Sequence, residues 1–153
     1  MSRTGAAGFT LIEILIVVAF IAVLAGAAVP AVTDAMRRYS LTSASQQVGN
    51  TIRSARQQAV GQNAVRRVRF NFPAAGQYQV LDAADAADAA VGDVQFLPAG
   101  ADFGAVSGDI AITTSGRVTD LAGNPTTETI VLSNDDGQTR TITVSPSGRV
   151  ELP

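Results

Sequence analysis

The chain opens with an apolar run that carries a single acid, Gly5-Ala-Ala-Gly-Phe-Thr-Leu-Ile-Glu-Ile-Leu-Ile-Val-Val-Ala-Phe20. From Phe9 to Thr33 the only charged residue is Glu13. A helix needs about 20 apolar residues to cross the hydrocarbon of a membrane, so this run is long enough. A carboxylate at the centre of a span costs roughly 2.5–3.5 kcal/mol, and less near the interface. The sequence therefore predicts a membrane helix over residues 9–33 in which Glu13 needs an explanation.

Three interpretations of this run compete. It can be a plain N-terminal anchor, in which Glu13 in the first helical turn interacts with the helix dipole. It can be a secretory signal peptide, because Ala25-Gly26-Ala27 has the small residues of a cleavage site. The mature chain would then be a secreted β-domain that begins near Ala28. In the third interpretation, a short polar head is removed and the apolar segment is kept, with Glu13 paired to another molecule.

The composition argues against catalysis. The 153 residues include no cysteine and no histidine, and all eleven basic residues are arginine. The commonest general base, the commonest metal ligands and an activating lysine are therefore absent. Neither the aspartates Asp82, Asp85, Asp88 and Asp93 nor the pair Asp135-Asp136 supplies the six to eight converging oxygens that calcium needs. We predict no enzyme activity, no catalytic residue, no cofactor and no metal site.

The helix is expected to continue beyond the membrane to Gly61. Apolar residues recur there at three- and four-residue spacing, which is typical of one face of an amphipathic helix: Leu41, Ala44, Val48, Ile52, Ala55 and Ala59. A helix from Phe9 to Gly61 is about 80 Å long. Pro30 lies inside it and is predicted to kink it, because proline removes one backbone hydrogen bond. Residues 34–61 then form the amphipathic continuation of residues 9–33.

Residues 62–153 predict a soluble β-rich domain. Alternating apolar residues and turn signals indicate strands, and Asn134-Asp-Asp-Gly137 is a good hairpin turn. The expected strands are 68–72, 77–81, 94–96, 110–112, 117–118, 129–133, 141–144 and 149–152. The fold class is α+β: a long N-terminal helix whose apolar stripe covers one face of an antiparallel sheet.

The N-terminal residues resemble a known processing signal. Gly8-Phe9-Thr10-Leu11-Ile12-Glu13, followed by an apolar run, is similar to the prepilin motif of type IV prepilins and type II secretion pseudopilins. The resemblance implies that a prepilin peptidase removes the leader 1–8 by cutting between Gly8 and Phe9. It also implies N-methylation of Phe9, and pairing of Glu13 with the terminal amine of a neighbouring subunit during assembly.

The C-terminal half narrows the resemblance. Residues 112–117 and 144–150 are similar to the soluble domain shared by pseudopilin H of type II secretion and the FimT/FimU minor pilins. The implied protein is a minor pilin-like subunit, anchored by one span in the bacterial inner membrane with its soluble domain in the periplasm. The implied partners are the prepilin peptidase, other pilin or pseudopilin subunits and the inner-membrane assembly platform. Type II secretion and type IV pilus biogenesis both remain open.

Charge is divided unevenly along the chain. Residues 34–70 hold seven arginines and one acid, whereas residues 79–153 hold eleven acids and three arginines. One interpretation is that the basic helix region packs against the acidic sheet of the next subunit. Another is nucleic-acid contact through Arg53, Arg56 and Arg149, as in a DNA-binding minor pilin for DNA uptake. Gly148 and Arg149 match the Gly-Arg-x-Arg element of certain FimT-type pilins, but Glu151 replaces its second arginine, so nucleic acid is disfavoured.

Overall fold

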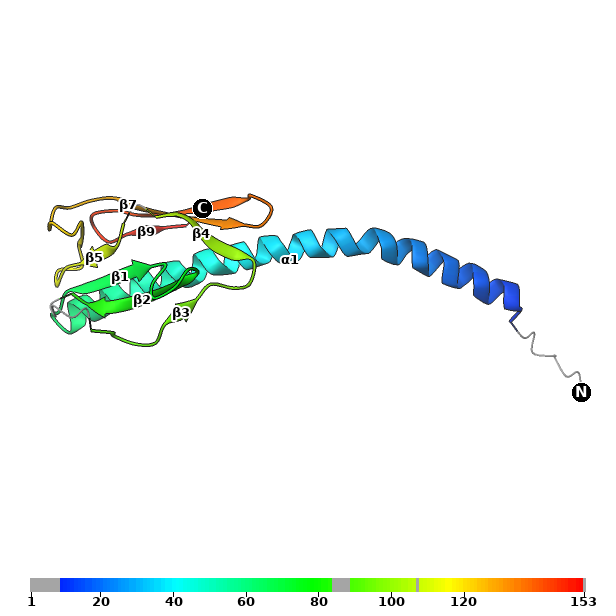
Figure 1. Ribbon diagram of the computed structural model, residues 1–153, viewed down its shortest axis with the longest axis horizontal. Coiled ribbons are helices and arrows are strands. Elements are labelled where there is room, and N and C mark those ends of the chain that lie inside the picture. The colour runs from blue at the N-terminus through cyan, green and yellow to red at the C-terminus, as the bar shows by residue number, and fades with distance from the viewer. Residues whose placement is uncertain (1–8, 84–88, 107, 153) are drawn as a thin grey trace, which may run out of the picture. The chain divides into compact units, whose positions relative to one another are not determined.

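The structure is a computed structural model that describes residues 9–83, 89–106 and 108–152. The chain divides into two compact units, Met1–Met36 and Arg37–Pro153. One long helix, α1 (Leu11–Gly61), is followed in the described residues by strands and the loops between them (Figure 1). The strands in the described part of the chain are β1 (Arg66–Phe70), β2 (Gln77–Asp82), β3 (Gln95–Phe96), β4 (Ala101–Val106), β5 (Ile110–Ile112), β6 (Val118–Thr119), β7 (Glu128–Asn134), β8 (Thr139–Val144) and β9 (Val150–Glu151).

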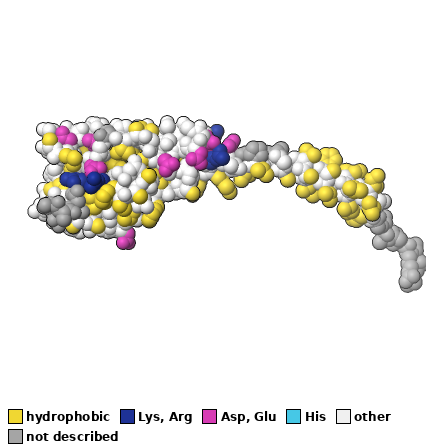
Figure 2. Space-filling model, in the orientation of Figure 1, with side chains coloured by type: hydrophobic (Ala, Val, Ile, Leu, Met, Phe, Trp, Pro, Cys, Tyr) yellow, Lys and Arg dark blue, Asp and Glu magenta, His cyan; other side chains and the backbone are white. Residues whose placement is uncertain are grey.

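The first part of α1 makes up most of the described residues of the N-terminal unit. Figure 2 shows apolar side chains along its described part. The helix continues through Pro30, and the kink expected at this residue stays a prediction. Among the residues that the structure describes, no helix has the length and apolar character needed to cross a membrane.

In the second unit, α1 buries the stripe that its spacing predicts. All six apolar residues of the stripe are at most 3% exposed: Leu41, Ala44, Val48, Ile52, Ala55 and Ala59. They form one core with apolar residues of the strands, including Val68, Ile110 and Ile142. The predicted packing of the helix on the β-rich part is therefore confirmed. Burial of this face, rather than helix propensity, gives the helix most of its stability.

The helix ends at Gly61 as predicted, but glycine is not the residue that turns the chain. Asn63 adopts a positive φ of 51°, and the N–H of Ala64 donates to the carbonyl of Ala59 at 3.1 Å. Asparagine tolerates the left-handed conformation better than other residues with a side chain do. Asn63, just beyond the helix, therefore turns the chain, the role that was expected of Gly61.

The β-rich part forms two antiparallel sheets rather than the single sheet expected from the sequence. The first sheet has the order β3-β2-β1-β5-β6, and the second has the order β4-β7-β8-β9. The β1–β2 hairpin aligns Val68 with Val80, and the β7–β8 hairpin aligns Ile130 with Ile142. Both hairpins were predicted, as was the turn Asn134–Gly137. Strand β4 was not predicted, and it forms one edge of the second sheet.

Aromatic side chains link the two sheets. Phe70 of β1 and Tyr78 of β2 lie in the first sheet, and Phe103 of β4 lies in the second. The Phe103 ring centroid is 5.4 Å from that of Phe70 and 5.9 Å from that of Tyr78, with an edge-on arrangement to Tyr78. Such pairs contribute about 0.5–1.5 kcal/mol beyond the area they bury. The unpredicted strand β4 thus supplies the ring that joins the two sheets.

Burial of Tyr78 predicts a loss of stability at alkaline pH. Burial raises the pKa of the Tyr78 phenol above its ordinary value of 10.0, although the nearby side chains of Thr51 and Gln47 partly oppose the rise. Below pH 10 both states hold the proton and stability is complete. Above pH 10 the Tyr78 phenol ionises first in the unfolded state, because its pKa is lower there than in the folded state. We therefore expect the free energy of unfolding to fall as pH rises toward the folded pKa, by at most about 1.4 kcal/mol per pH unit.

Urea titrations of the fragment 34–153 on either side of pH 10 measure this loss. We expect Tyr78→Phe to lose less stability than the parent over the same pH interval. Tyr39→Phe is the matched control, because the Tyr39 side chain is 76% exposed. Equal alkaline losses in the parent and in Tyr78→Phe would contradict the prediction.

Candidate functional site

The first turn of α1 is capped by a residue of the prepilin-like motif. Thr10 precedes the helix, and its Oγ1 accepts a hydrogen bond from the backbone N–H of Glu13 at 3.3 Å. The carbonyl of Thr10 accepts from the N–H groups of Glu13 and Ile14 at 3.1 and 3.3 Å. Thr10 is therefore the N-cap and Glu13 is the third helical residue, the spacing of a capping box. That Thr-x-x-Glu spacing is visible in the sequence, but the cap was not predicted.

Glu13 lies among exposed apolar side chains. Phe9, Leu11 and Phe20 are 79%, 80% and 67% exposed, and Glu13 itself is exposed. A contiguous apolar surface of this kind marks a membrane or protein contact. The positive end of the helix dipole accounts for an acid in the first turn but not for the apolar surface around it. Gly8, the residue expected before the cleavage site, lies outside the described residues.

Two loops of the second unit have the same sequence pattern and the same hydrogen bonds. They are Thr113-Thr-Ser-Gly-Arg117 and Ser145-Pro-Ser-Gly-Arg149, which we call the twin loops. In each, the first hydroxyl accepts from the N–H four residues later at 3.2 Å. In each, the glycine N–H donates to the first carbonyl at 2.8 Å. The two glycines have φ values of 76° and 78°, a conformation that glycine adopts without steric cost.

Arg56 of α1 fastens the helix to the twin loops. Its Nε donates to the carbonyl of Gly116 at 2.9 Å. The second loop lies against the first, because the N–H of Val118 donates to the carbonyl of Pro146 at 3.0 Å. A Cβ built on Gly148 would lie 2.5 Å from the Arg56 Nε. Arg56 therefore has a structural role inside the subunit, which the sequence did not predict.

The three arginines named as possible nucleic-acid contacts line one groove. This groove, of about 550 Å³, is bordered by Arg53, Arg56, Gln57, Ser147, Gly148, Arg149 and Val150. Arg53 donates to the side chain of Asn50 at 3.0 Å and to the carbonyl of Val150 at 3.3 Å. The Arg149 guanidinium lies 3.3 Å from the carboxylate of Glu151. The chain thus brings the three residues together, with partners of the same subunit on each, and their role toward nucleic acid stays a prediction.

Ion pairs join the basic and acidic parts of the sequence within one subunit. Each pair takes its arginine from residues 37–69 and its aspartate from residues 82–136: Arg37–Asp136, Arg66–Asp82 and Arg69–Asp109. The Arg66–Asp82 pair is 2.7 Å long, and the Arg66 side chain is only 5% exposed. Part of the charge asymmetry is therefore used in folding, which the packing hypothesis between subunits did not include.

Several of the acidic positions considered for calcium pair with arginines or lie outside the described residues. Asp82 and Asp136 pair with arginines, and Asp85 and Asp88 fall in the segment that is not described. Within the described ranges, no three acidic residues converge on a point where they could hold a metal ion. Ser145 and Ser147 belong to the second twin loop, where their hydroxyls lie 2.9 Å apart.

A long N-terminal helix packed on antiparallel sheets is a pilin-like α+β fold. Residues 44–148 match the model of the type II transport protein GspH family. The chain therefore belongs to the GspH family of pseudopilins. It is a structural subunit of the minor pilin and pseudopilin class and not an enzyme. A comparison with curated proteins gives no match.

Two kinds of solved structure share the fold. The type IV minor pilin FimU of Pseudomonas aeruginosa is 19% identical with a TM-score of 0.60, and the match covers 76% of this chain and 90% of FimU. The minor pseudopilin EpsH of the type 2 secretion system of Vibrio cholerae is 13% identical with a TM-score of 0.56. That match covers 74% of this chain and 96% of EpsH. At these identities the likeness shows the fold, and it confirms the predicted α+β architecture.

Proposed function

We propose that the chain is a minor subunit of a type II secretion pseudopilus or a type IV pilus, matured by cleavage between Gly8 and Phe9. The leader 1–8 is removed by a prepilin peptidase, and Phe9 becomes the N-methylated terminus. Residues 9–33 anchor the subunit in the inner membrane, with the soluble unit in the periplasm. From there it joins other subunits on the assembly platform and supports protein secretion or pilus biogenesis.

The exposed apolar surface around Glu13 is the observation that carries the proposal. A helix apolar on all sides needs either lipid or other apolar helices around it. The processing motif runs into the first turn of this helix. There the Thr10 Oγ1 accepts a hydrogen bond from the Glu13 N–H at 3.3 Å. Cleavage before Phe9 would place a new positive amine next to that turn. The same apolar surface of the helix thus contacts lipid before assembly and neighbouring helices of the filament after it.

Glu13 supplies the directional part of the interaction. In a medium of low dielectric, a carboxylate without a partner is costly, and an ammonium group of a neighbour relieves the cost. Apolar contact alone is nondirectional and would allow helices to slide past one another. The Glu13–amine pair fixes which residues of neighbouring helices meet. Glu13 is therefore proposed as an assembly residue with no catalytic role.

Replacing Glu13 by glutamine tests this role with little change in shape. We expect Glu13→Gln subunits to be cleaved normally and to enter filaments at least about tenfold less well, since a hydrogen bond to a charged group contributes about 1.5–3 kcal/mol. The measurement compares the amount of each variant in purified filaments with its amount in the membrane. Asp34→Asn is the matched control, because this exposed acid lies beyond the apolar run.

N-terminal sequencing of the membrane-purified parent tests the processing step separately. The proposal expects Phe9 as the first residue. A start near Ala28 would instead identify a signal peptide and reject the anchored subunit. Normal incorporation of Glu13→Gln, with cleavage before Phe9, would reject the assembly role of Glu13 and leave the processing intact.

A further inference from the structure

A cleft at the start of the second unit carries two arginines. It has a volume of about 400 Å³ and is lined by Arg38, Leu41, Gln138, Thr139 and Arg140. Arg38 and Leu41 belong to α1, whereas the other three lead into and begin β8. Residues distant in the sequence are thus brought together around one opening. We call this opening the Arg38–Arg140 cleft.

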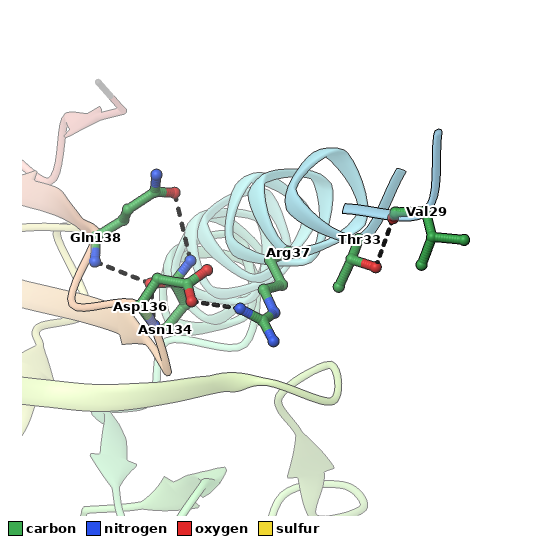
Figure 3. Close-up of polar contacts among 6 residues, drawn as sticks. All are labelled: Val29, Thr33, Arg37, Asn134, Asp136 and Gln138. Atoms are coloured by element: carbon green, nitrogen blue, oxygen red, sulfur yellow. Dashed lines mark hydrogen bonds and ion pairs between the residues drawn. The ribbon is translucent and has the colours of Figure 1, made fainter. Parts of the chain in front are cut away.

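The turn before β8 is held in place by several hydrogen bonds. The Asn134 Oδ1 accepts from the N–H groups of Asp136 and Gln138 at 3.2 and 2.9 Å, and the Gly137 N–H donates to the Asn134 carbonyl at 3.0 Å. Arg37 pairs with Asp136, which ties the turn to α1 (Figure 3). The start of β8, and with it Arg140, is therefore positioned against the helix rather than left on a free loop.

The chemistry of the lining suits a phosphate ester. Arginine binds phosphate through two parallel N–H donors, and the cleft is lined by two arginines, an amide and a hydroxyl. The neighbouring carboxylate of Asp136 is engaged by Arg37. Leu41 also lines the cleft, but it is only 3% exposed, so the polar donors supply the contacts to a ligand. These donors match the phosphate of an anionic headgroup.

The sequence places the cleft close to a membrane surface. Arg38 follows Thr33, the last residue of the proposed span, by five residues, which is about 7.5 Å of helix. A headgroup layer is about 5–7 Å thick on each side of the hydrocarbon. Tyr39 is 76% exposed, and tyrosine is enriched at this depth of a membrane. We propose that the Arg38–Arg140 cleft binds the phosphate of an anionic phospholipid headgroup, an inference that rests on the proposed membrane anchor.

Lipid binding at this cleft would act on the subunit before assembly. The headgroup holds the soluble unit against the bilayer in a fixed orientation while the apolar helix remains in lipid. Each arginine near an anionic surface contributes about 1 kcal/mol, equivalent to about fivefold in affinity. Entry into a filament removes the subunit from the lipid and breaks these contacts. The cleft thus favours the membrane-bound form of the subunit.

A titration of the full chain in phosphocholine micelles tests the inference. Short-chain phosphatidylglycerol is added, and the NMR signals of Thr139 and of the arginine side chains are followed; short-chain phosphatidylcholine and inorganic phosphate are titrated in parallel. We expect saturable shifts at Arg38, Thr139 and Arg140 with phosphatidylglycerol. The same shifts at the same concentration of either comparison compound would overturn the assignment to an anionic lipid.

Variants locate the site. Arg38→Gln with Arg140→Gln should weaken the affinity for phosphatidylglycerol by at least about tenfold, whereas Arg117→Gln, an exposed arginine outside the cleft, should leave it unchanged. An unchanged affinity in the double variant would reject the cleft, provided that its amide spectrum shows the parent fold. This result, with normal membrane fractionation and cleavage before Phe9, would reject the cleft alone and leave the proposed subunit function standing.

Discussion

Gly148→Ala is expected to destabilise the second unit by about 2–5 kcal/mol. The residue has a φ of 78°, so a side chain there costs roughly 1–2 kcal/mol of backbone strain. The added Cβ would also collide with the carbonyl oxygen of Gly116 and lie 2.5 Å from the Arg56 Nε and 2.8 Å from its Cδ. Such overpacking typically costs a further ~1–3 kcal/mol. Urea unfolding of the fragment 34–153 measures the sum.

Gly137→Ala separates strain from collision. Gly137 has nearly the same φ, 75°, but nothing lies within 4 Å of a Cβ built there. We therefore expect Gly137→Ala to lose only the strain, roughly 1–2 kcal/mol. Similar losses in the two variants would show that the contact between the twin loops and Arg56 does not constrain the fold. A larger loss at Gly148 confirms that the loops and the helix are tightly packed there.

The second large effect is expected at the buried ion pair. Asp82→Ala should destabilise the second unit by about 3–5 kcal/mol, because it leaves the Arg66 guanidinium buried without its carboxylate. The Arg66 side chain is 5% exposed. Its terminal nitrogens donate one hydrogen bond to Asp82 and one to Gln62, and only the bond to Gln62 remains in the variant. The free energy of unfolding of the fragment 34–153 is again the measurement.

The exposed pair Arg37–Asp136 provides the control. Its side chains are 42% and 35% exposed, so water solvates each charge when the other is removed. We expect Asp136→Ala to cost at most about 1 kcal/mol. If Asp82→Ala lowers the free energy of unfolding no more than Asp136→Ala does, the burial of Arg66 does not determine how much its ion pair contributes to stability. A stability recovered by replacing both Arg66 and Asp82 with apolar residues would further identify the lone charge as the cause.

The helix and the hairpins were predictable because their signals are local. Residues at three- and four-residue spacing share one face of a helix whatever the rest of the chain does, and all six residues of the predicted stripe are buried. Asn134-Asp-Asp-Gly137 likewise specifies a turn by itself, and it connects β7 and β8. The strand boundaries differ from the expected ones by up to two residues. Residues 68–72 were expected to form a strand, whereas β1 begins at Arg66, because Arg66 pairs in the sheet although it is not apolar.

The division into two sheets was not predictable from these signals. Alternation tells which side chains of a strand are buried, but it does not tell which strand lies beside it. Strand β4 was missed because Ala101–Val106 has a register shift between Phe103 and Ala105 and lies at a sheet edge. Its burial therefore does not alternate regularly, and Gly104 weakens the pattern further. Phe103 was the one strong signal, an aromatic residue that packs on the other sheet.

The candidate sites also divide into those that neighbouring residues in the sequence predict and those that only the fold brings together. The N-terminal segment could be predicted from consecutive residues, and so could its threonine cap, from the spacing of Thr10 and Glu13. The hydrogen bond from Arg56 to the twin loops could not be predicted, because Arg56 and Gly116 are 60 positions apart. The repeated Ser/Thr-x-Ser-Gly-Arg pattern was visible, yet only the fold shows that its two copies lie together. The Arg38–Arg140 cleft likewise exists only once β8 is placed on α1.

Leu152 packs on the helix across Gly49, and this contact has a consequence for the order of events during folding. Gly49 leaves room for this side chain, whose Cδ2 would lie 3.0 Å from a Cβ at that position. The side chain that covers Gly49 therefore lies far from it in the sequence. Bringing the two together closes a long loop of chain, which costs conformational entropy, so we expect this patch of helix to be covered late in folding.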